Sequence, residues 1–417
     1  MPMRLIHTSD WHLGHHLHGL GRAREHQAFL DWLLDTVAER RADALLIAGD
    51  VFDTANPSAA AQHAWFDFLG RLRRRLPALD VVVIAGNHDS PARLGAPAPI
   101  LGPLGVHVVG SVRRDGATVH TAGLVAPLRD ASGRVAAQVG AVPYLRLPDL
   151  PPVQVDDDQD PVIEGVRSLY DQVFDAARRA GGPDQALIGM GHCYMTGTAL
   201  SELSERRILG GNLHALPAAL FPEDVAYVAL GHLHKAQQVG DERVRYCGSP
   251  LPLSMAEATY HHQVLQVDFQ GPRRVGVESL TVPRTVDLVR IPPGPDHLPV
   301  DQALAAVDAL PQRGPEDDPS SWPYLEVKVT LTQPRPDLRR ELEDRLATRA
   351  ARLVRIGTQG TGHGHALADG IRTTGLDGLT PTQVFRRRWA RDHDDPVPAS
   401  LLASFHELVQ AAQEAGG

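Results

Sequence analysis

Apolar runs and amphipathic segments alternate along the first part of the chain. The apolar runs at residues 44–48 and 81–85 are typical of buried strands. Residues 25–41 and 58–76 carry apolar side chains at helical spacing, and Ser58 is the expected N-cap of the second helix. Strand–helix alternation followed by several successive strands predicts a layered α/β domain with a mixed sheet. The other expected strands are residues 4–8, 106–109, 118–124, 135–143, 187–190, 225–230, 243–247, 263–269 and 274–282, and the other expected helix is residues 162–179.

A second pattern begins near residue 282. The expected strands there are residues 285–291, 324–331 and 352–356, and the expected helices are residues 300–310 and 336–350. This βαβαβ order fits a small α+β module. The predicted division is a first domain at 1–282, a capping domain at 283–357, a flexible linker rich in Gly, Thr and His at 358–379, and a C-terminal helical tail at 380–417.

Composition places the chain among globular proteins. It has 417 residues, of which 43% are hydrophobic and 22% charged, and this length suggests two or three domains. No apolar run is long enough to predict a membrane span, and Cys193 and Cys247 are too few for a disulfide framework. The N-terminal segment lacks the apolar stretch of a signal peptide. A cytoplasmic location without membrane contact is therefore expected.

The net charge limits how the chain could bind nucleic acid. Its formal value is −9, which argues against a generally basic coat. Bound divalent cations supply positive charge that such a count ignores. Any DNA contact is therefore expected to come from local arginine clusters and from metal ions.

Five polar motifs come directly after predicted strands. Four of them have a glycine before the first polar residue, which lets the chain turn sharply and lets a ligand approach the backbone. The ends of strands in α/β sheets are where binding sites assemble. The motifs are SDWH at 9–12, GD at 49–50, GNHD at 86–89, GH at 191–192 and GHLH at 231–234.

The residue types in these motifs predict a metal centre. Two divalent ions ~4 Å apart need a bridging carboxylate and several further oxygen and nitrogen donors. Mixed carboxylate, amide and imidazole donors without a thiolate suit Mn, Fe or Zn. The candidate ligands are Asp10, His12, Asp50, Asn87, His192, His232 and His234.

The same motifs carry a resemblance to a known family. DWHLG, GDVFD, GNHDS, GH and GHLH resemble the calcineurin-like metallophosphoesterases. Within these, GDVFDTANPS, GNHDSPARL, and GHLHKAQ followed by YCGSPLPLS are similar to the bacterial SbcD nucleases. The likeness covers the first predicted domain, is weaker over the capping domain and returns at the C-terminal helices. The sequence departs from the family at Ala236, where proline is usual, and in the Gly/His-rich residues 357–378, which have no known family counterpart.

The resemblance implies a fold and roles for the motif residues. The fold would be a four-layer α/β sandwich, in which two mixed sheets are flanked by helices. Asp50 would bridge two ions, with Mn²⁺ as the expected metal. His88 would contact the scissile phosphate and protonate or stabilise the leaving oxygen. Asp89 would orient a neighbouring histidine, or alternatively cap a turn. One ion would be held by Asp10, His12, Asp50 and His234, and the other by Asp50, Asn87, His192 and His232.

The implied function is a metal-dependent DNA exonuclease and endonuclease that also opens hairpins. Such a protein would be the nuclease subunit of a complex with an SbcC-type coiled-coil ATPase in double-strand-break repair and recombination, and a homodimer is expected. Two alternatives stay open, namely a small-molecule phosphodiesterase or phosphatase and a non-catalytic DNA-end-binding subunit. The intact ligand set argues against the second, and the capping domain and tail argue against the first.

The C-terminal helices predict a docking element. The first helix carries Phe385 and Trp389 on roughly one face, and the second carries Phe405 within another apolar stripe. Two short helices after a flexible linker cannot bury both stripes on each other, which favours a partner groove. The alternative is that they fold back on the capping domain.

Three further residues have a less definite role. Asp53 could contact substrate or His88, or act within a helix or turn. His7 is expected in the core, and Cys193 is expected to serve packing.

Overall fold

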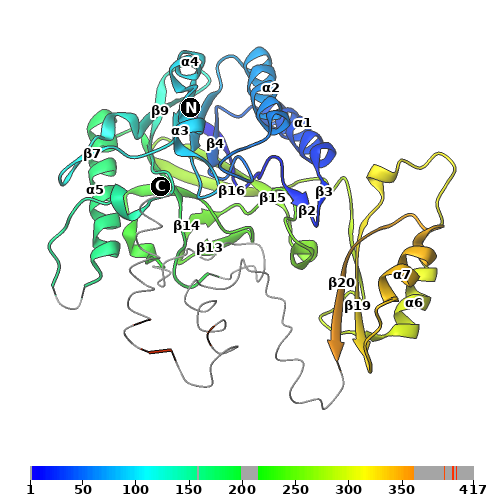
Figure 1. Ribbon diagram of the computed structural model, residues 1–417. Helices are drawn as coiled ribbons and strands as arrows, with labels where there is room; N and C mark the ends of the chain where they lie inside the picture. The colour runs from blue at the N-terminus through cyan, green and yellow to red at the C-terminus, as the bar shows by residue number, and fades with distance from the viewer. Residues whose placement is uncertain are drawn as a thin grey trace. The chain divides into compact units, whose positions relative to one another are not determined.

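The computed structural model describes residues 2–156, 159–198 and 215–360, together with residues 389, 397–398 and 401. The described residues up to Gln359, apart from residues 332–334, form one compact unit. This unit contains two six-stranded sheets and a smaller four-stranded sheet (Figure 1).

The first sheet has the strand order β16-β15-β1-β4-β5-β6. Its four strands from β1 to β6 are parallel, while β15 runs antiparallel to β1 and β16 runs antiparallel to β15. The bounds are β1 (Pro2–Thr8), β4 (Ala44–Ala48), β5 (Asp80–Ile84), β6 (Val106–Val109), β15 (Gln263–Gln270) and β16 (Arg273–Thr281).

Helices cover one face of this sheet. Successive side chains of a strand point to opposite faces. Leu45 and Ile47 of β4 therefore pack in one cluster with α1 (Ala23–Glu39) and α2 (Ala59–Arg75), whereas Leu46 lies in the core shared with the second sheet. The N-cap prediction is confirmed, because Ser58 Oγ accepts a hydrogen bond from the amide of Ala61 at 3.2 Å.

The second sheet has the order β13-β14-β12-β11-β10-β9. β10, β11, β12 and β14 are parallel, and the two edge strands β9 and β13 run antiparallel to their neighbours. The bounds are β9 (Val125–Arg129), β10 (Val135–Ala141), β11 (Ala186–His192), β12 (Val225–Gly231), β13 (Gln237–Val239) and β14 (Asp241–Tyr246).

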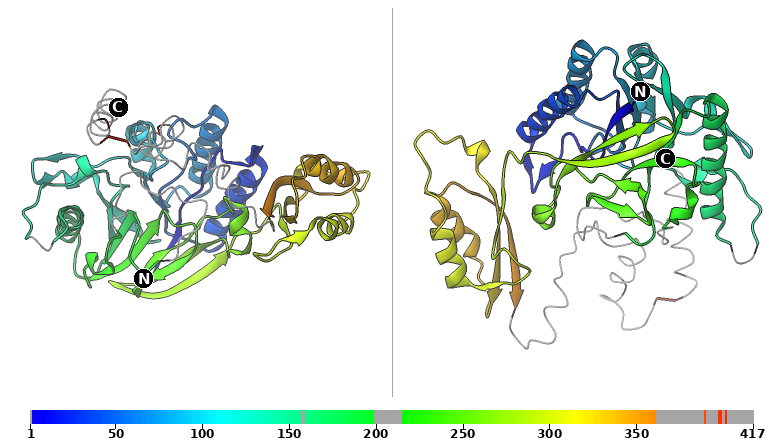
Figure 2. Two further views of the ribbon diagram at one scale, coloured as in Figure 1. Left: turned by 60° about the horizontal axis from the view of Figure 1, so that its bottom comes forward. Right: turned by 180° about the vertical axis from the view of Figure 1, so that it is seen from behind.

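A single long helix, α5 (Pro161–Ala180), covers the outer face of the second sheet. Gly140 and Gly189 are paired across β10 and β11. A Cβ at either position would lie 3.0–3.2 Å from Val173 or Phe174 of α5, so the two glycines let the helix pack closely. Helices, two mixed sheets and a further helix thus form four layers, and the α/β sandwich prediction is confirmed (Figure 2).

The small module has its own sheet and core. β19 pairs with β17, β18 and β20, and the two helices bury Leu304 and Leu342 against the strands. The bounds are β17 (Leu288–Ile291), β18 (Leu298–Pro299), α6 (Val300–Asp308), β19 (Tyr324–Leu331), α7 (Leu338–Leu346) and β20 (Arg352–Gly360).

Short elements complete the first domain, and one prediction fails among them. The expected strand at 118–124 is wrong, because β8 ends at Val119 and a 3-10 turn at Thr121–Gly123 precedes β9. Its apolar residues serve a bend between two short strands. The short elements are β2 (His16–Leu17), β3 (Leu20–Gly21), α3 (Pro91–Gly95), α4 (Ala98–Leu101), β7 (Arg114–Asp115) and β8 (Thr118–Val119).

The last strand is longer than expected, and most of the C-terminal tail lies outside the described residues. β20 continues to Gly360, four residues beyond the expected strand end at 356. The predicted docking residues Phe385 and Phe405 lie outside the described residues, whereas Trp389 is described and is helical. Among the described residues, none of the helices has the length and apolar character needed to cross a membrane.

Candidate metal centre

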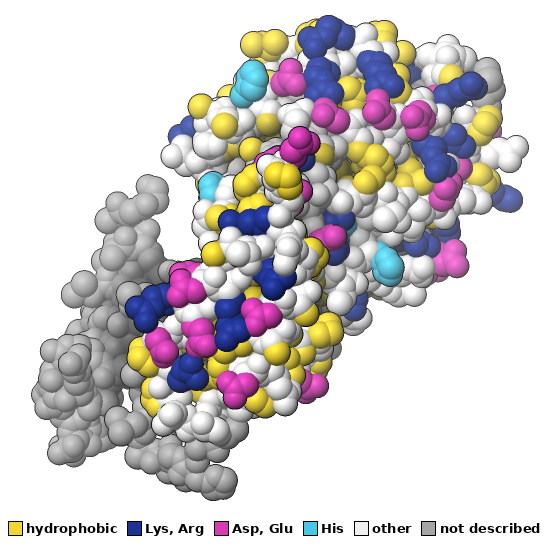
Figure 3. Space-filling view, turned by 90° about the vertical axis from the view of Figure 1, so that its right-hand side faces the viewer, with side chains coloured by type: hydrophobic (Ala, Val, Ile, Leu, Met, Phe, Trp, Pro, Cys, Tyr) yellow, Lys and Arg dark blue, Asp and Glu magenta, His cyan; other side chains and the backbone are white. Residues whose placement is uncertain are grey.

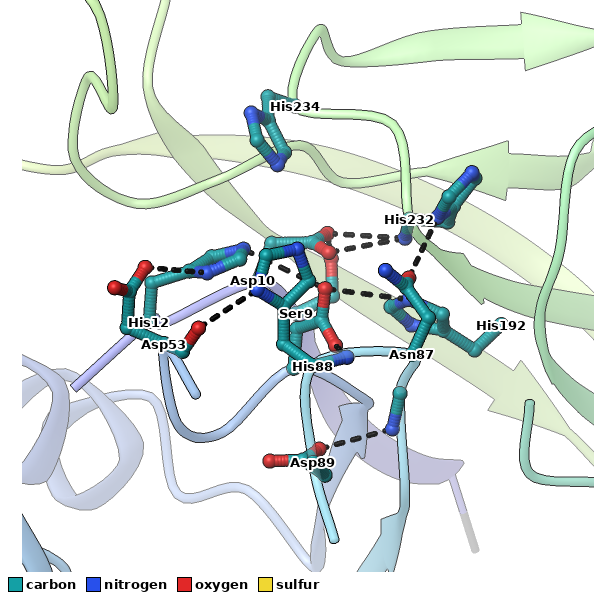
Figure 4. A network of polar contacts seen from close by, with 12 residues as sticks. Ser9, Asp10, His12, Asp53, Asn87, His88, Asp89, His192, His232 and His234 are labelled. Carbon is teal, nitrogen blue, oxygen red and sulfur yellow. Dashed lines mark hydrogen bonds and ion pairs between the residues drawn. The ribbon is translucent and has the colours of Figure 1, made fainter. Parts of the chain in front are cut away.

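The predicted ligands of the first sheet follow three adjacent parallel strands. Asp10 and His12 come after β1, Asp50 after β4 and Asn87 after β5. Because the carboxyl ends of parallel strands meet at one edge, the four side chains are brought together. Figure 4 labels Asp10, His12 and Asn87 among them.

The second sheet contributes the remaining three predicted ligands. His192 is the last residue of β11, and His232 and His234 come directly after β12. All three are buried, as are Asp10, His12 and Asp50, whereas Asn87 is half-buried. Burying so many polar side chains together costs free energy unless partners replace the hydrogen bonds that they made to water.

The backbone at this site is unusual. Four of the predicted ligands have positive φ angles, a region that residues other than glycine rarely adopt. The angles are 54° at Asp10, 46° at His12, 51° at Asp50 and 103° at His232. Strained conformations of this kind persist only where the surrounding structure imposes them, and they cluster at functional sites.

The glycines before the ligands are required by close approach. A Cβ on Gly86 would lie 2.1 Å from Asp50 Oδ1, and one on Gly231 would lie 1.9 Å from the carbonyl oxygen of Ala48. The motifs therefore have glycine because backbone and ligand atoms occupy the space that a side chain would need.

Asp50 lies between histidines of the two sheets. Its Oδ2 is 3.5 Å from Nε2 of His12 and 3.5 Å from Nε2 of His192. Its Oδ1 accepts a hydrogen bond from the amide of His88 at 2.8 Å, which fixes the carboxylate in place. A single carboxylate between two imidazoles has the arrangement expected of a bridging ligand.

Asn87 lies between two histidines of the second sheet. Its Oδ1 is 2.9 Å from Nε2 of His192 and 2.9 Å from Nδ1 of His232. Because Nδ1 of His192 contacts the carbonyl oxygen of Ala48 at 2.8 Å, its Nε2 is the nitrogen left to face the site. The amide and both imidazoles thus converge on one point.

The donors fit divalent cations. Asp10, His12 and His234 form one group of ligand atoms that lie within 4.8 Å of one another, and Asp10, Asp50 and His192 form another. In addition, Nε2 of His12 is buried and has no hydrogen-bond partner in the described part of the chain. Carboxylate, amide and imidazole donors around an unpartnered imidazole nitrogen match a mixed oxygen and nitrogen metal site.

The buried carboxylate and imidazoles of this site shift one another's pKa values. Burial opposes ionisation of Asp50, but His192 and His12 hold its pKa well below the usual range. Burial lowers the pKa of His192, yet the adjacent Asp50 raises it to about 9. Burial lowers the pKa of His232 to about 3. Asp50 and His192 thus each favour the charged form of the other, and because an imidazole ligand must be neutral, binding of a cation there would be favoured by higher pH.

His88 has a ligand atom within 4.8 Å of those of His12 and Asp50, and its ring is also held from outside this group. Its Nδ1 is 2.7 Å from the carbonyl oxygen of Asp53, and its ring centroid is 4.7 Å from that of His12. The residue is half-buried. The Asp53 carboxylate contacts Nδ1 of His12 at 3.3 Å. Asp53 thus holds both histidines, through its backbone for His88 and its side chain for His12.

Asp89 makes contacts other than the predicted one to a histidine. Its carboxylate accepts hydrogen bonds from the amides of Gly86, Phe52 and Val51 at 2.9, 2.9 and 3.2 Å. The buried side chain therefore ties the GNHD loop to the GDVF loop. Burial, followed by the neighbouring Asp50, raises the pKa of Asp89 to about 6.

Glu257 is a site residue that the sequence did not reveal. Its fully buried carboxylate contacts Nδ1 of His234 at 3.1 Å and accepts a hydrogen bond from the amide of Leu253 at 2.8 Å. It follows His234 by 23 residues in a short 3-10 helix at Met255–Thr259. No motif spacing marks it, and only the folded chain brings it to the histidine.

Two predictions concern residues outside the ligand group, namely His7 and Cys193. His7 is fully buried, and its Nδ1 contacts the Tyr227 hydroxyl at 2.8 Å, so its assignment to the core is confirmed. Cys193 lies beside His192 and contacts the sulfur of Met195 at 3.8 Å, in agreement with a packing role.

Comparison with known proteins gives consistent matches. The calcineurin-like phosphoesterase family matches residues 3–236, and a family described as the type 5 capsule protein repressor C-terminal domain matches residues 284–393. The chain is 39% identical to the SbcD subunit of the SbcCD nuclease from Rhodobacter capsulatus over 79% of this chain and 82% of that protein. It is 33% identical to the protein of the same name from Escherichia coli K12 over 94% of each chain.

The contact between Glu257 and His234 predicts an effect on metal affinity. Glu257→Gln should weaken binding of a divalent ion ~10–100-fold, because the carboxylate that orients the imidazole is replaced by a neutral amide. Isothermal titration of the purified protein with Mn²⁺ measures this. Glu278→Gln, at an exposed residue of β16 that pairs with Arg40, is the matched control. Unchanged affinity in Glu257→Gln would show that the carboxylate serves only the fold.

Proposed function

The chain belongs to the calcineurin-like phosphoesterases and to their SbcD nuclease-subunit family, and on this premise we propose that it cleaves DNA at free ends and hairpins. It is a phosphodiester hydrolase of the nuclease type. The observation that carries the proposal is the single carboxylate of Asp50, which lies between the histidines of two adjoining donor groups. A subunit that only bound DNA ends would not need this buried set.

The proposed ligands divide around Asp50. Asp10, His12 and His234 hold one ion with it, and Asn87, His192 and His232 hold the other, with Mn²⁺ as the proposed metal because the donors are mixed oxygen and nitrogen. Two such ions stabilise charge on the phosphoryl oxygens and lower the pKa of water. The protein's own contribution is to fix the donors and to keep bulk water from them.

His88 is the proposed proton donor. Because Nδ1 contacts the carbonyl oxygen of Asp53, a proton for the leaving oxygen would come from Nε2 of the imidazolium form. The ring is half-buried beside His12. His88 can therefore protonate the leaving oxygen of the phosphodiester while the donors around Asp50 position the phosphate.

Charge constrains how DNA is bound. The net charge is −9, and the face shown in Figure 3 has basic and acidic side chains interspersed rather than one continuous basic surface. Affinity must therefore come from a few local cations and the metal ions, and it should fall as salt rises.

A partner and a second copy complete the proposal. The C-terminal segment with Phe385, Trp389 and Phe405 is proposed to dock on an SbcC-type coiled-coil ATPase, since apolar stripes rimmed by arginines suit a partner groove. A homodimer is also proposed, and the exposed Phe66 of α2 and Ile100 of α4 supply apolar surface for it. The cytoplasm is the proposed location.

The first test of the function uses the bridging carboxylate. The wild-type chain should degrade labelled duplex, hairpin and single-stranded DNA when Mn²⁺ is present and lose this activity in a chelator. Asp50→Ala should lose the activity as well, because one carboxylate serves both ions. Asp35→Ala, at an exposed residue of α1, is the control and should keep it. Wild-type rates from Asp50→Ala would disprove the site assignment.

A second test separates chemistry from metal binding. His88→Ala should retain its metal content while the turnover of DNA falls ~10²–10⁴-fold, the usual contribution of a general acid. Metal analysis of the purified variant and single-turnover kinetics measure the two quantities. His63→Ala, on the exposed side of α2, should match the wild type in both. Loss of metal from His88→Ala would make His88 a ligand.

The docking proposal predicts a separation of assembly from catalysis. The double variant Phe385→Ala and Phe405→Ala should fail to co-purify with the ATPase, because each apolar stripe loses an aromatic side chain. Its Mn²⁺-dependent cleavage of DNA in isolation should remain at the wild-type level. A double variant that still forms the complex contradicts the proposal, as does loss of isolated nuclease activity on deleting residues 379–417.

A further inference from the structure

The segment after β10 is fixed to the metal centre by its backbone. The amide of Val142 donates a hydrogen bond to the carbonyl oxygen of Met190 at 3.2 Å, and the amide of Tyr144 donates one to that of Ala85 at 2.8 Å. Met190 lies two residues before His192, and Ala85 lies two residues before Asn87. The segment is thus attached beside β5 and β11, two of the three strands that supply the second donor group.

The side chain of Tyr144 packs against His192. Its ring centroid is 6.2 Å from that of His192, with the ring planes at 79°, so the two rings meet edge to face. Tyr144 is half-buried, and its hydroxyl has no hydrogen-bond partner in the described part of the chain. Burial raises the pKa of this phenol, which therefore stays neutral at physiological pH. A polar group without a partner stands beside the site.

Arg146 places a positive charge against the ring of Tyr144. Its guanidinium carbon lies 5.6 Å from the centroid of the Tyr144 ring, within the range of a cation–π contact. Its amide donates a hydrogen bond to the Asp149 carboxylate at 2.7 Å, which fixes the backbone at this residue. The aromatic ring and the anchored backbone together restrict where the exposed guanidinium can be.

The environment of Arg146 differs from that of three other arginines of the second sheet and its loops. Arg129 and Arg134, at the edges of β9 and β10, form ion pairs with Asp80 and Asp130. Arg114 donates hydrogen bonds to backbone carbonyl oxygens. Within the described ranges, the side chain of Arg146 has no carboxylate partner. This cation rests on a ring that contacts His192, in a chain of net charge −9, and is available for an anion.

We propose that Arg146, held on the ring of Tyr144, binds the phosphate next to the scissile one in the nucleic-acid strand. A guanidinium matches the oxygens of a phosphate with two parallel hydrogen bonds. Tyr144 is then a positioning residue, which acts by keeping the guanidinium at the edge of the site. The inference rests on the proposed cleavage of DNA and adds a subsite for the neighbouring nucleotide.

The subsite predicts a difference between substrates with one phosphate and with several. Arg146→Ala should raise KM for a single-stranded oligonucleotide about tenfold or more, because a charge-assisted hydrogen bond to the neighbouring phosphate is lost. Its kcat/KM should also depend less on salt, by about one phosphate contact. Hydrolysis of bis(4-nitrophenyl) phosphate, which has no second phosphate, should remain at the wild-type rate.

Matched variants separate charge, ring and general damage. Arg146→Lys should recover part of the oligonucleotide affinity, Tyr144→Phe should resemble the wild type, and Tyr144→Ala should lose affinity because the ring no longer holds the guanidinium. Arg134→Ala, at an exposed arginine just before β10, should leave both substrates unaffected.

Three outcomes would overturn the inference. Wild-type KM and salt dependence in Arg146→Ala would remove the subsite while leaving the nuclease proposal intact. An equal loss on both substrates would assign Arg146 to the support of the metal centre instead. Failure of the wild-type chain to cleave the oligonucleotide while it hydrolyses bis(4-nitrophenyl) phosphate would contradict the nuclease proposal and the subsite together.

Discussion

The backbones of the two large sheets approach each other closely at the carbonyl oxygen of Ala48. This oxygen is 2.8 Å from Nδ1 of His192, and a Cβ on Gly231 would lie 1.9 Å from it. β4 and β12 can approach so closely only because glycine stands at the end of β12. Without this approach, the polar side chains that follow the first sheet could not meet those that follow the second.

The remaining features of the site follow from that contact. Bringing two sheet ends together buries several carboxylates and imidazoles away from water, which is costly unless they find partners. Part of the compensation is internal, since Asp53, Asp89 and Glu257 hold ligand side chains or ligand loops by hydrogen bonds. The rest requires cations, so a divalent ion that binds the native site also stabilises the fold.

The sequence predicted much of this arrangement because the motifs are local. A glycine followed by metal-ligand residues at a strand end is visible without a structure, and the alternating apolar runs indicate the α/β class. What it could not predict depends on distant segments. Glu257 reaches His234 through the fold alone, and the two roles of Asp53 arise from how its loop bends. The expected strand at 118–124 failed because apolar content alone does not distinguish a bend from a strand.

The left-handed backbone at Asp10, His12, Asp50 and His232 also has a consequence for biosynthesis. Each of these conformations is stable only while neighbouring segments enforce it. Those segments include β12 and also β15, which pairs with β1 yet begins only at Gln263. A growing polypeptide on the ribosome therefore lacks a formed catalytic centre until nearly all of its first 270 residues have emerged. An incomplete product would carry the motifs without the strands that hold their backbone in this conformation.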